Sequence, residues 1–386
     1  MNWIRGWSVA MLCSFLLTPV GAAAQANVEE LRQQFDSVIE DLNDNSFERF
    51  NRAISKKDMT ARIYGASVIE ADVKAAFSKE FATTIQGMFT SSFPKSKKEI
   101  LGTVLDFEFK GNEGRAVVRY ASSGYRYSYH VYELAVDSKG RLVIQDWIDY
   151  YQASRFSEQA AEGLVTLMPS KTATRSLLKK RAYNDAQVFQ AGELFKAVRD
   201  GQPERFFQIF DEMDETLIKE PVLLRLNLQL AMAFPQSPRA GNAVRLIVET
   251  YPNEALYSLH RSNHYIQTGQ FAEAIEVLAT LQAALGVRDG ATESLRSAAA
   301  LAMDNAADAE KYALQATTAE PSLEVGWWSL LRARTRAGDY SGATEALARL
   351  EDDFDYSMDP ATLRRDRFLR VLAGKPEYLD WRASRK

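Results

Sequence analysis

The hydrophobic positions in the first part of the chain repeat with the period of an α-helix. Between Val28 and Phe93, apolar residues recur at intervals of three and four, which is typical of helices with one buried face. Asn45 and Ser46 are residue types that cap helices, and they precede a second apolar stripe. The pattern predicts three helices with these buried residues: Val28, Leu31, Phe35, Val38, Ile39 and Leu42; Phe47, Phe50 and Ile54; and, over 71–88, Val73, Phe77, Phe81 and Ile85.

The pattern changes to the period of a β-strand after Pro94. From Glu99 to Tyr151 apolar and polar residues alternate, and aromatic and β-branched residues, which favour strands, dominate. Short polar turns divide this stretch into four strands, at 101–109, 115–121, 125–136 and 141–151. Neighbouring strands joined by short turns form an antiparallel meander. Residues 27–152 are therefore predicted to form an α+β domain, with three helices before a four-stranded antiparallel sheet.

This order of helices and strands resembles the nuclear transport factor 2-like family over residues 28–152. The resemblance is one of topology, because no short motif in the stretch identifies the family. It implies a cone-like domain. A cystatin-like domain, or another domain in which helices pack on a sheet, is the alternative.

A repeat of about 34 residues organises the C-terminal half, which has an alanine-rich helical pattern. Gly269, Phe271 and Ala274 recur as Gly338, Tyr340 and Ala343, which is 69 residues or two units later. The midpoint is Asp304, where Ala309 keeps the alanine offset, and earlier units fall at Pro235 and Gly201. A constant spacing of this kind indicates stacked helical pairs.

These units resemble tetratricopeptide (TPR) repeats. The copy that carries the resemblance best has Trp327 and Leu330 before the Gly338 turn, although Arg334 stands where the motif prefers an aromatic residue. The resemblance implies an all-α TPR-like solenoid over 183–382, after a linker at 153–182. Stacked repeats of this family leave a groove, lined by the first helix of each pair, that usually binds an extended peptide or a helix of another protein.

Polar and aromatic residues on the first helices are the candidate partner-binding residues of that groove. They are Asn263, His264, Tyr265, Trp327, Trp328, Arg332 and Arg334. A row of arginines after the two tryptophans would suit an acidic peptide or a terminal carboxylate. The alternative is that a tryptophan belongs to the core and that the arginines form a solvated helix face.

The first 26 residues have the pattern of a cleaved secretory signal. Arg5 precedes the apolar segment 8–20, and the small residues of 22–26 fit a signal-peptidase site. The apolar segment is too short for a permanent membrane span. A lipoprotein is not expected, because the single cysteine, Cys13, lies in the middle of the apolar segment after Met-Leu. We therefore expect a periplasmic or secreted protein without cysteine and without a transmembrane span after cleavage.

The charge of the chain argues against a nucleic-acid partner. The sequence has 47 Lys and Arg against 51 Asp and Glu, a formal net charge of −4, whereas proteins that grip nucleic acid usually carry a basic excess. Short basic clusters occur at 95–98, 179–181 and 364–367. Each is either solvated surface or a contact for anionic envelope polymers or lipid headgroups.

One set of residues in the predicted sheet could support chemistry or ligand binding. His130 shares a strand face with Arg126, and Asp146 and Asp149 are within reach on the fourth strand. A His–Asp pair can act in acid–base catalysis, but the aromatic residues around it are equally suited to coat a sheet face. His260 and His264 are four apart, but no H-E-x-x-H motif or third ligand accompanies them, so no metal and no cofactor are expected.

These observations favour an exported, non-enzymatic scaffold or adaptor of the bacterial cell envelope that binds a protein or peptide in the repeat groove. A small-molecule-binding protein or an enzyme that acts around His130 is the alternative. A purely structural homo-oligomer is a third hypothesis.

Overall fold

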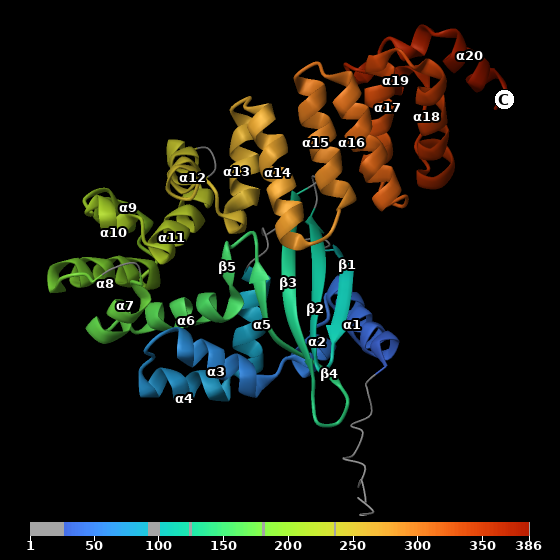
Figure 1. The fold of residues 1–386 in the computed structure, drawn as a ribbon. Helices are drawn as coiled ribbons and strands as arrows, with labels where there is room; N and C mark the ends of the chain where they lie inside the picture. The colour runs from blue at the N-terminus through green and yellow to red at the C-terminus, as the bar shows by residue number, and fades with distance from the viewer. Residues whose placement is uncertain (1–26, 92–100, 123–125, 180–181, 235–236, 386) are drawn as a thin grey trace, which may run out of the picture.

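The computed structural model describes residues 27–91, 101–122, 126–179, 182–234 and 237–385. Within these ranges a group of helices precedes one antiparallel sheet, and a long series of helices follows it (Figure 1). The predicted signal segment 1–26 lies outside the described residues. No helix in the described ranges is both long and apolar enough to cross a membrane.

The helices before the sheet are more numerous than predicted. In the described part they are α1 (Val28–Asn43), α2 (Glu48–Ala53), α3 (Lys56–Ala66), α4 (Ala71–Lys79) and α5 (Phe81–Ser91). The predicted third helix is divided at Glu80, whose backbone leaves the helical conformation, and α3 was missed because only Met59 and Ile63 of it are buried. The predicted cap at Asn45 and Ser46 is also wrong, because Asn45 has a positive φ and α2 begins without a side-chain cap.

The sheet is an antiparallel meander, as the alternating pattern predicts, with five strands where four were expected. The strand order is β1-β2-β3-β4-β5, and the strands are β1 (Leu101–Lys110), β2 (Glu113–Ser122), β3 (Arg126–Val136), β4 (Leu142–Asp149) and β5 (Ser154–Arg155). The additional strand is the two-residue β5, which pairs with the end of β4. Its shortness leaves no alternating pattern to detect.

Both faces of the sheet are buried over β2, β3 and β4, whereas no residue of the edge strand β1 is fully buried. One face, which includes Val118 and Tyr132, packs against the N-terminal helices, and the ring of Phe35 on α1 lies 5.4 Å from the ring of Tyr132. The opposite face, which includes Val117 and Tyr129, packs against residues of the C-terminal half. The sheet is therefore the middle layer between the N-terminal helices and the helical repeats (Figure 1).

The segment 153–182, predicted as a linker, is largely helical and packed. It contains α6 (Phe156–Leu167) and α7 (Lys171–Leu177). The ring of Phe156 stacks on Trp147 of the sheet at 3.9 Å between centroids, and the buried residues of both helices belong to the same hydrophobic core as the sheet. The chain therefore passes from the sheet into the helical half without an extended connection.

The remaining described helices form successive antiparallel pairs, which confirms the prediction of helical repeats. The pairs are α8 (Asp185–Arg199) with α9 (Pro203–Asp211), α11 (Pro221–Met232) with α12 (Pro238–Thr250), α13 (Ser258–Gln267) with α14 (Phe271–Leu285), α15 (Gly290–Ala302) with α16 (Ala306–Ala319), and α17 (Glu324–Ala337) with α18 (Tyr340–Phe354). The short helices α10 (Glu215–Ile218) and η1 (Ala255–Tyr257) lie between pairs. Helices α19 (Pro360–Arg365), η2 (Leu372–Gly374) and α20 (Pro376–Ala383) cover the last pair.

The turn inside the pairs has one repeated geometry. Gly201, Gly269, Asp304 and Gly338 all have a positive φ, between 61° and 80°. In each case the next residue donates its backbone N–H to a carbonyl five residues earlier, as Asn305 does to Ala300. A left-handed residue with this bond ends a helix sharply, so the chain reverses at a fixed point of each unit. Five residues after three of these turns, Ala274, Ala309 and Ala343 are fully buried where helices cross.

Candidate protein-interaction surface

Equivalent positions on the first helices form a row of side chains open to solvent. The residues six and two positions before each turn are Asn263 and Gln267 on α13, Ala298 and Ala302 on α15, and Arg332 and Arg336 on α17. All are exposed except Arg332, which is half-buried. Helices α15 and α17 pack against each other, so their residues at the same repeat position lie side by side, whereas α13 is connected to α15 through α14, which packs on both. We call these six residues the first-helix stripe.

The stripe ends in an aromatic cluster near the C-terminus. The Trp328 ring lies 5.2 Å from the ring of Tyr356 and 5.4 Å from the Arg332 guanidinium. Arg332 also donates to Asp366 at 2.8 Å, and Arg336 pairs with Asp304. Both stripe arginines are thus matched by carboxylates of the same chain.

Two of the predicted partner-binding residues of α17, Trp327 and Arg334, do not share the side of the helix that carries Arg332. The Trp327 indole donates to the Pro321 carbonyl at 2.8 Å and lies under the Arg349 guanidinium of α18. Arg334 is two positions from Arg332, which is about 200° around a helix, and it binds Glu310 and Glu345 of the neighbouring helices at 3.1 Å. The predicted row of arginines is therefore not continuous, because alternate residues of a helix face opposite ways.

Only one of the three predicted partner-binding residues on α13 lies on the stripe. Asn263 is exposed on the stripe, whereas His264 and Tyr265 are half-buried and their rings are 5.8 Å apart. The structure thus brings Asn263, Trp328 and Arg332 to the open side of the first helices.

One edge of the repeats, where α14 ends and α15 begins, is covered by the chain's own sheet. We call it the inter-repeat edge. Val117, Tyr129 and Val131 pack against Leu259 of α13 and Leu285 of α14, with other apolar residues around them. The Arg115 guanidinium donates to the Leu285 carbonyl, and the Tyr151 carbonyl lies 2.8 Å from Nε2 of His260. This edge of the solenoid is closed to a partner.

A buried ionic network holds the sheet on the repeats. Arg119 of β2 binds Asp289, the N-cap of α15, and Glu320 after α16, with 2.9 Å between its Nη2 and Glu320 Oε1. Tyr129 donates its hydroxyl to the second oxygen of Asp289 at 2.6 Å. Burial alone would lower the pKa of Arg119, but the Asp289 and Glu320 carboxylates raise it above its ordinary value, so the guanidinium stays charged.

The predicted ligand site around His130 is buried, and its residues do not form one cluster. His130 is 0% exposed and is surrounded by the rings of Phe89, Tyr120, Tyr132 and Trp147. Its Nε2 lies 3.4 Å from Asp149 Oδ2, so the predicted His–Asp pair exists, but inside a packed aromatic core.

The other members of that predicted site do not join the pair. Asp146 accepts hydrogen bonds from the Ser157 hydroxyl at 2.6 Å and from the Ser157 backbone N–H at 3.1 Å. Burial raises the pKa of Asp146, and these donors partly oppose the rise. Arg126 begins β3, and its side chain lies outside the described part of the structure.

His260 and His264 do not form a metal site. Nε2 of His260 is occupied by the Tyr151 carbonyl, and burial lowers the pKa of His260 while that carbonyl partly raises it. In the part of the chain that the structure describes, no group of three or more His, Cys, Asp or Glu residues is arranged to hold a metal ion.

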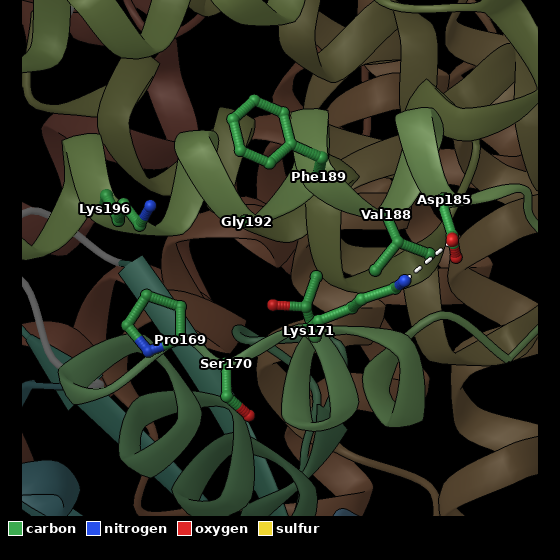
Figure 2. A pocket seen from close by; sticks show the side chains of 9 residues that line it. Pro169, Ser170, Lys171, Asp185, Val188, Phe189, Gly192 and Lys196 are labelled. Carbon is green, nitrogen blue, oxygen red and sulfur yellow. Dashed lines mark ion pairs between the residues drawn. The ribbon is translucent and has the colours of Figure 1, made fainter.

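Sequence reasoning missed a pocket between α7 and α8, because it treated 153–182 as a linker. The pocket has a volume of about 310 Å³ and is lined by Pro169, Lys171, Val188, Phe189 and Lys196, among others (Figure 2). The Lys171 ammonium reaches across it to Asp185 at 2.7 Å, as Figure 2 shows. The signals that could have revealed it are Ser170 and Asn184, whose side chains cap α7 and α8.

Comparisons with known proteins add a limited structural likeness. No protein-family model and no curated protein matches the chain. Among solved structures, MamA from Desulfovibrio magneticus RS-1 matches 45% of this chain and 98% of its own, with 17% identity and a TM-score of 0.34. A double mutant of MamA from RS-1 matches with 18% identity and a TM-score of 0.35, over 45% of this chain and 97% of its own. At such TM-scores the likeness supports no conclusion about activity or partners, and the repeat architecture rests on the turns and buried alanines described above.

Proposed function

We propose that the protein is an exported, non-enzymatic interaction scaffold of the bacterial cell envelope, and that a protein or peptide partner binds along the first-helix stripe. The observation that carries this proposal is the distribution of open and closed faces on the repeats. The crossing positions between helices are buried, the inter-repeat edge is covered by the sheet, and the stripe stays open at equivalent positions of three repeats.

The stripe suits an extended peptide. Ala298 and Ala302 in its middle leave space for a peptide backbone, and the amides of Asn263 and Gln267 can bond backbone N–H and C=O groups. Trp328 at the other end offers an aromatic face for an apolar or cationic side chain, and such rigid aromatic residues often dominate binding energy.

The alternative of ligand binding or catalysis around His130 is not favoured by the packing. A ligand would have to displace fully buried rings such as Trp147 and Tyr132 to reach the imidazole. Large-to-small changes in such cores destabilise proteins by about 3–5 kcal/mol, so displacement of several rings is not a low-energy opening. The resemblance of 27–152 to nuclear transport factor 2-like domains is kept as a proposal, supported by helices that cover one face of a meander sheet.

The stripe is tested by blocking its middle. Ala298→Glu and Ala302→Glu together place two carboxylates over the open face, whereas Ala272→Glu and Ala283→Glu together add two to exposed alanines of the second helix α14 as a matched control. In cells of the source bacterium, a photo-cross-linking amino acid at Ala298 should capture a partner, and one at Ala272 should not. Pull-down of that partner should fail with the double variant and persist with the control. An identical cross-linking pattern from both positions would overturn the proposal.

The proposed location and assembly state have separate tests. N-terminal sequencing of the protein from the periplasmic fraction should find a start within or just after 22–26; an intact Met1 in the cytoplasmic fraction would refute export. Light scattering over a range of protein concentrations distinguishes a scaffold that needs a foreign partner from a homo-oligomer, whose mass would rise with concentration.

A further inference from the structure

The covering segment at the C-terminal end of the solenoid carries a concentrated positive charge. Arg364 and Arg365 end α19, and Arg367 and Arg370 follow in the turn before η2. All four are exposed. We call Arg364, Arg365, Arg367 and Arg370 the arginine patch.

The arginine patch differs from most other exposed arginines in having no carboxylate partners; Arg49, which donates to the Ser37 carbonyl at 3.4 Å, is a lone exception outside the patch among the described residues. Within the described residues none of its four guanidinium groups forms an ion pair, whereas Arg52, Arg141, Arg199 and Arg245 each bind a nearby carboxylate at 2.7–3.0 Å. The acidic residue inside the patch segment, Asp366, is engaged by Arg332 at 2.8 Å. The N-cap Asp359 lies at the opposite end of α19. The patch therefore keeps its full charge for an external anion.

The backbone beneath the patch is fixed. Leu363, Leu369 and Leu372 are buried in the core of the last repeat, with 0–1% exposure, and they alternate with the arginines along the chain. Arg370 donates its backbone N–H to the Asp366 carbonyl at 3.1 Å, which closes the turn. The arginines must then point outward, so their presentation needs no ordering of the backbone on binding.

The position of the patch suits a broad surface. Helices α19 and α20 lie at the tip of the solenoid, far from α3 and α4 of the N-terminal half (Figure 1). Val371, next to Arg370, is 49% exposed and adds an apolar side chain beside the cations. Arginine binds phosphate oxygens in a bidentate manner, and clusters of four or more cations are typical of sites that bind anionic headgroups.

We propose that the arginine patch docks the protein on an anionic lipid surface by binding headgroup phosphates, with Val371 inserted between the headgroups. The proposal is independent of the partner on the first-helix stripe, which involves other side chains. The two surfaces meet where Arg332 of the stripe pairs with Asp366 of the patch segment.

The test uses the full mature chain and sedimentation with vesicles. Vesicles of equal parts phosphatidylglycerol and phosphatidylcholine should bind the protein, and pure phosphatidylcholine vesicles should not. Because each cation adds to binding at an anionic surface, R364Q/R365Q/R367Q/R370Q should weaken binding by at least about tenfold. The matched control R52Q/R141Q/R199Q/R245Q removes the same charge from paired, exposed arginines and should bind as the unchanged protein does.

Further arms separate the headgroup proposal from other occupants. Val371→Ser should weaken binding while leaving its salt dependence unchanged, because it removes apolar contact and no charge. Millimolar inorganic phosphate should compete only weakly. Equal loss in both quadruple variants would show a general charge effect and overturn the proposal. So would a patch variant that keeps vesicle binding but loses binding to poly-glutamate, since this would identify an acidic polypeptide as the occupant. A thermal melt of each variant confirms folding.

Discussion

The buried network at Arg119 gives the sharpest test of how the two halves are joined. Arg119→Met keeps the length of the side chain and removes the guanidinium. The side chain is 5% exposed, and its carboxylate partners Asp289 and Glu320 are 0% and 16% exposed. The substitution therefore leaves two carboxyl groups without their cationic partner at the junction of sheet and repeats.

The expected loss of stability is about 3 kcal/mol. Removal of one partner from a buried ion pair usually destabilises by about 3–5 kcal/mol, because the remaining charge is uncompensated. Here the remaining groups keep other donors, which favours the lower end of that range. Asp289 keeps the Tyr129 hydroxyl at 2.6 Å and the Thr292 N–H at 2.7 Å, and Glu320 keeps the Gly290 N–H at 2.8 Å.

The assay is urea unfolding monitored by far-UV circular dichroism. The free energies of unfolding are compared between variants that have the same m-value, the slope of the free energy against urea concentration. R119M/D289N/E320Q replaces the charges by neutral groups that keep the capping bonds, and it should recover to within about 1 kcal/mol of the unchanged protein. The control Arg245→Met breaks an exposed pair with Glu249 on α12 and should change stability by less than about 0.5 kcal/mol. A loss below about 1 kcal/mol for Arg119→Met, or a triple variant no more stable than the single one, would refute the reasoning.

The remaining predictions concern local features. Gly338→Ala, at a φ of 80°, should destabilise by about 1–2 kcal/mol, whereas Gly241→Ala, exposed within α12, should stabilise by about 0.5–1 kcal/mol in the same urea assay. Ala309→Val overpacks a fully buried crossing and should lower stability by about 1–3 kcal/mol. Hydrogen bonds from the Arg141 side chain, and from backbone N–H groups, lower the pKa of Asp137 from 3.8 to about 2. The ionised Asp137 therefore stabilises the folded state fully above pH 3.8, and this stabilisation is lost as the pH falls through about 2. An NMR titration should find that low value, and Arg141→Ala should return the pKa towards 3.8; an unchanged value would contradict the assignment.

The repeats could be predicted from the sequence because their turns impose local requirements. Gly269 and Gly338 stand where the backbone has a positive φ, and the buried alanines stand where two helices approach closely. Such positions restrict residue type at fixed intervals, so the period is visible in a single chain. Asp304, at the same point with a φ of 61°, shows that the geometry persists where the glycine is absent.

The packing of the two halves could not be predicted, because its signals are not periodic. Arg119 and Asp289 are 170 positions apart, and nothing local distinguishes them from residues of exposed ion pairs. The helices α6 and α7 were missed for a different reason. The buried residues of α6, such as Phe156, Ala160 and Leu164, do recur at helical spacing, but the segment 153–182 was interpreted as a linker. For the candidate site, residue type on the first helices placed Asn263 and Trp328 among the candidate partner-binding residues, but it could not reveal the direction of each side chain.

The arrangement of layers limits where a partner can act. Strands β2, β3 and β4 are covered on one side by the N-terminal helices and on the other by the repeats, so most of their side chains are already engaged within the chain. The sheet therefore packs against one edge of the repeats. The sheet covers one edge of the repeats, and α19, η2 and α20 cover the last repeat at the other end, whereas Asn263, Ala298 and Arg332 stay partly or fully exposed. If the proposed peptide binds these residues, the free energy lost in ordering the protein would be small wherever the stack is already fixed, and the Arg119 network is the contact that we expect to fix the sheet against the repeats.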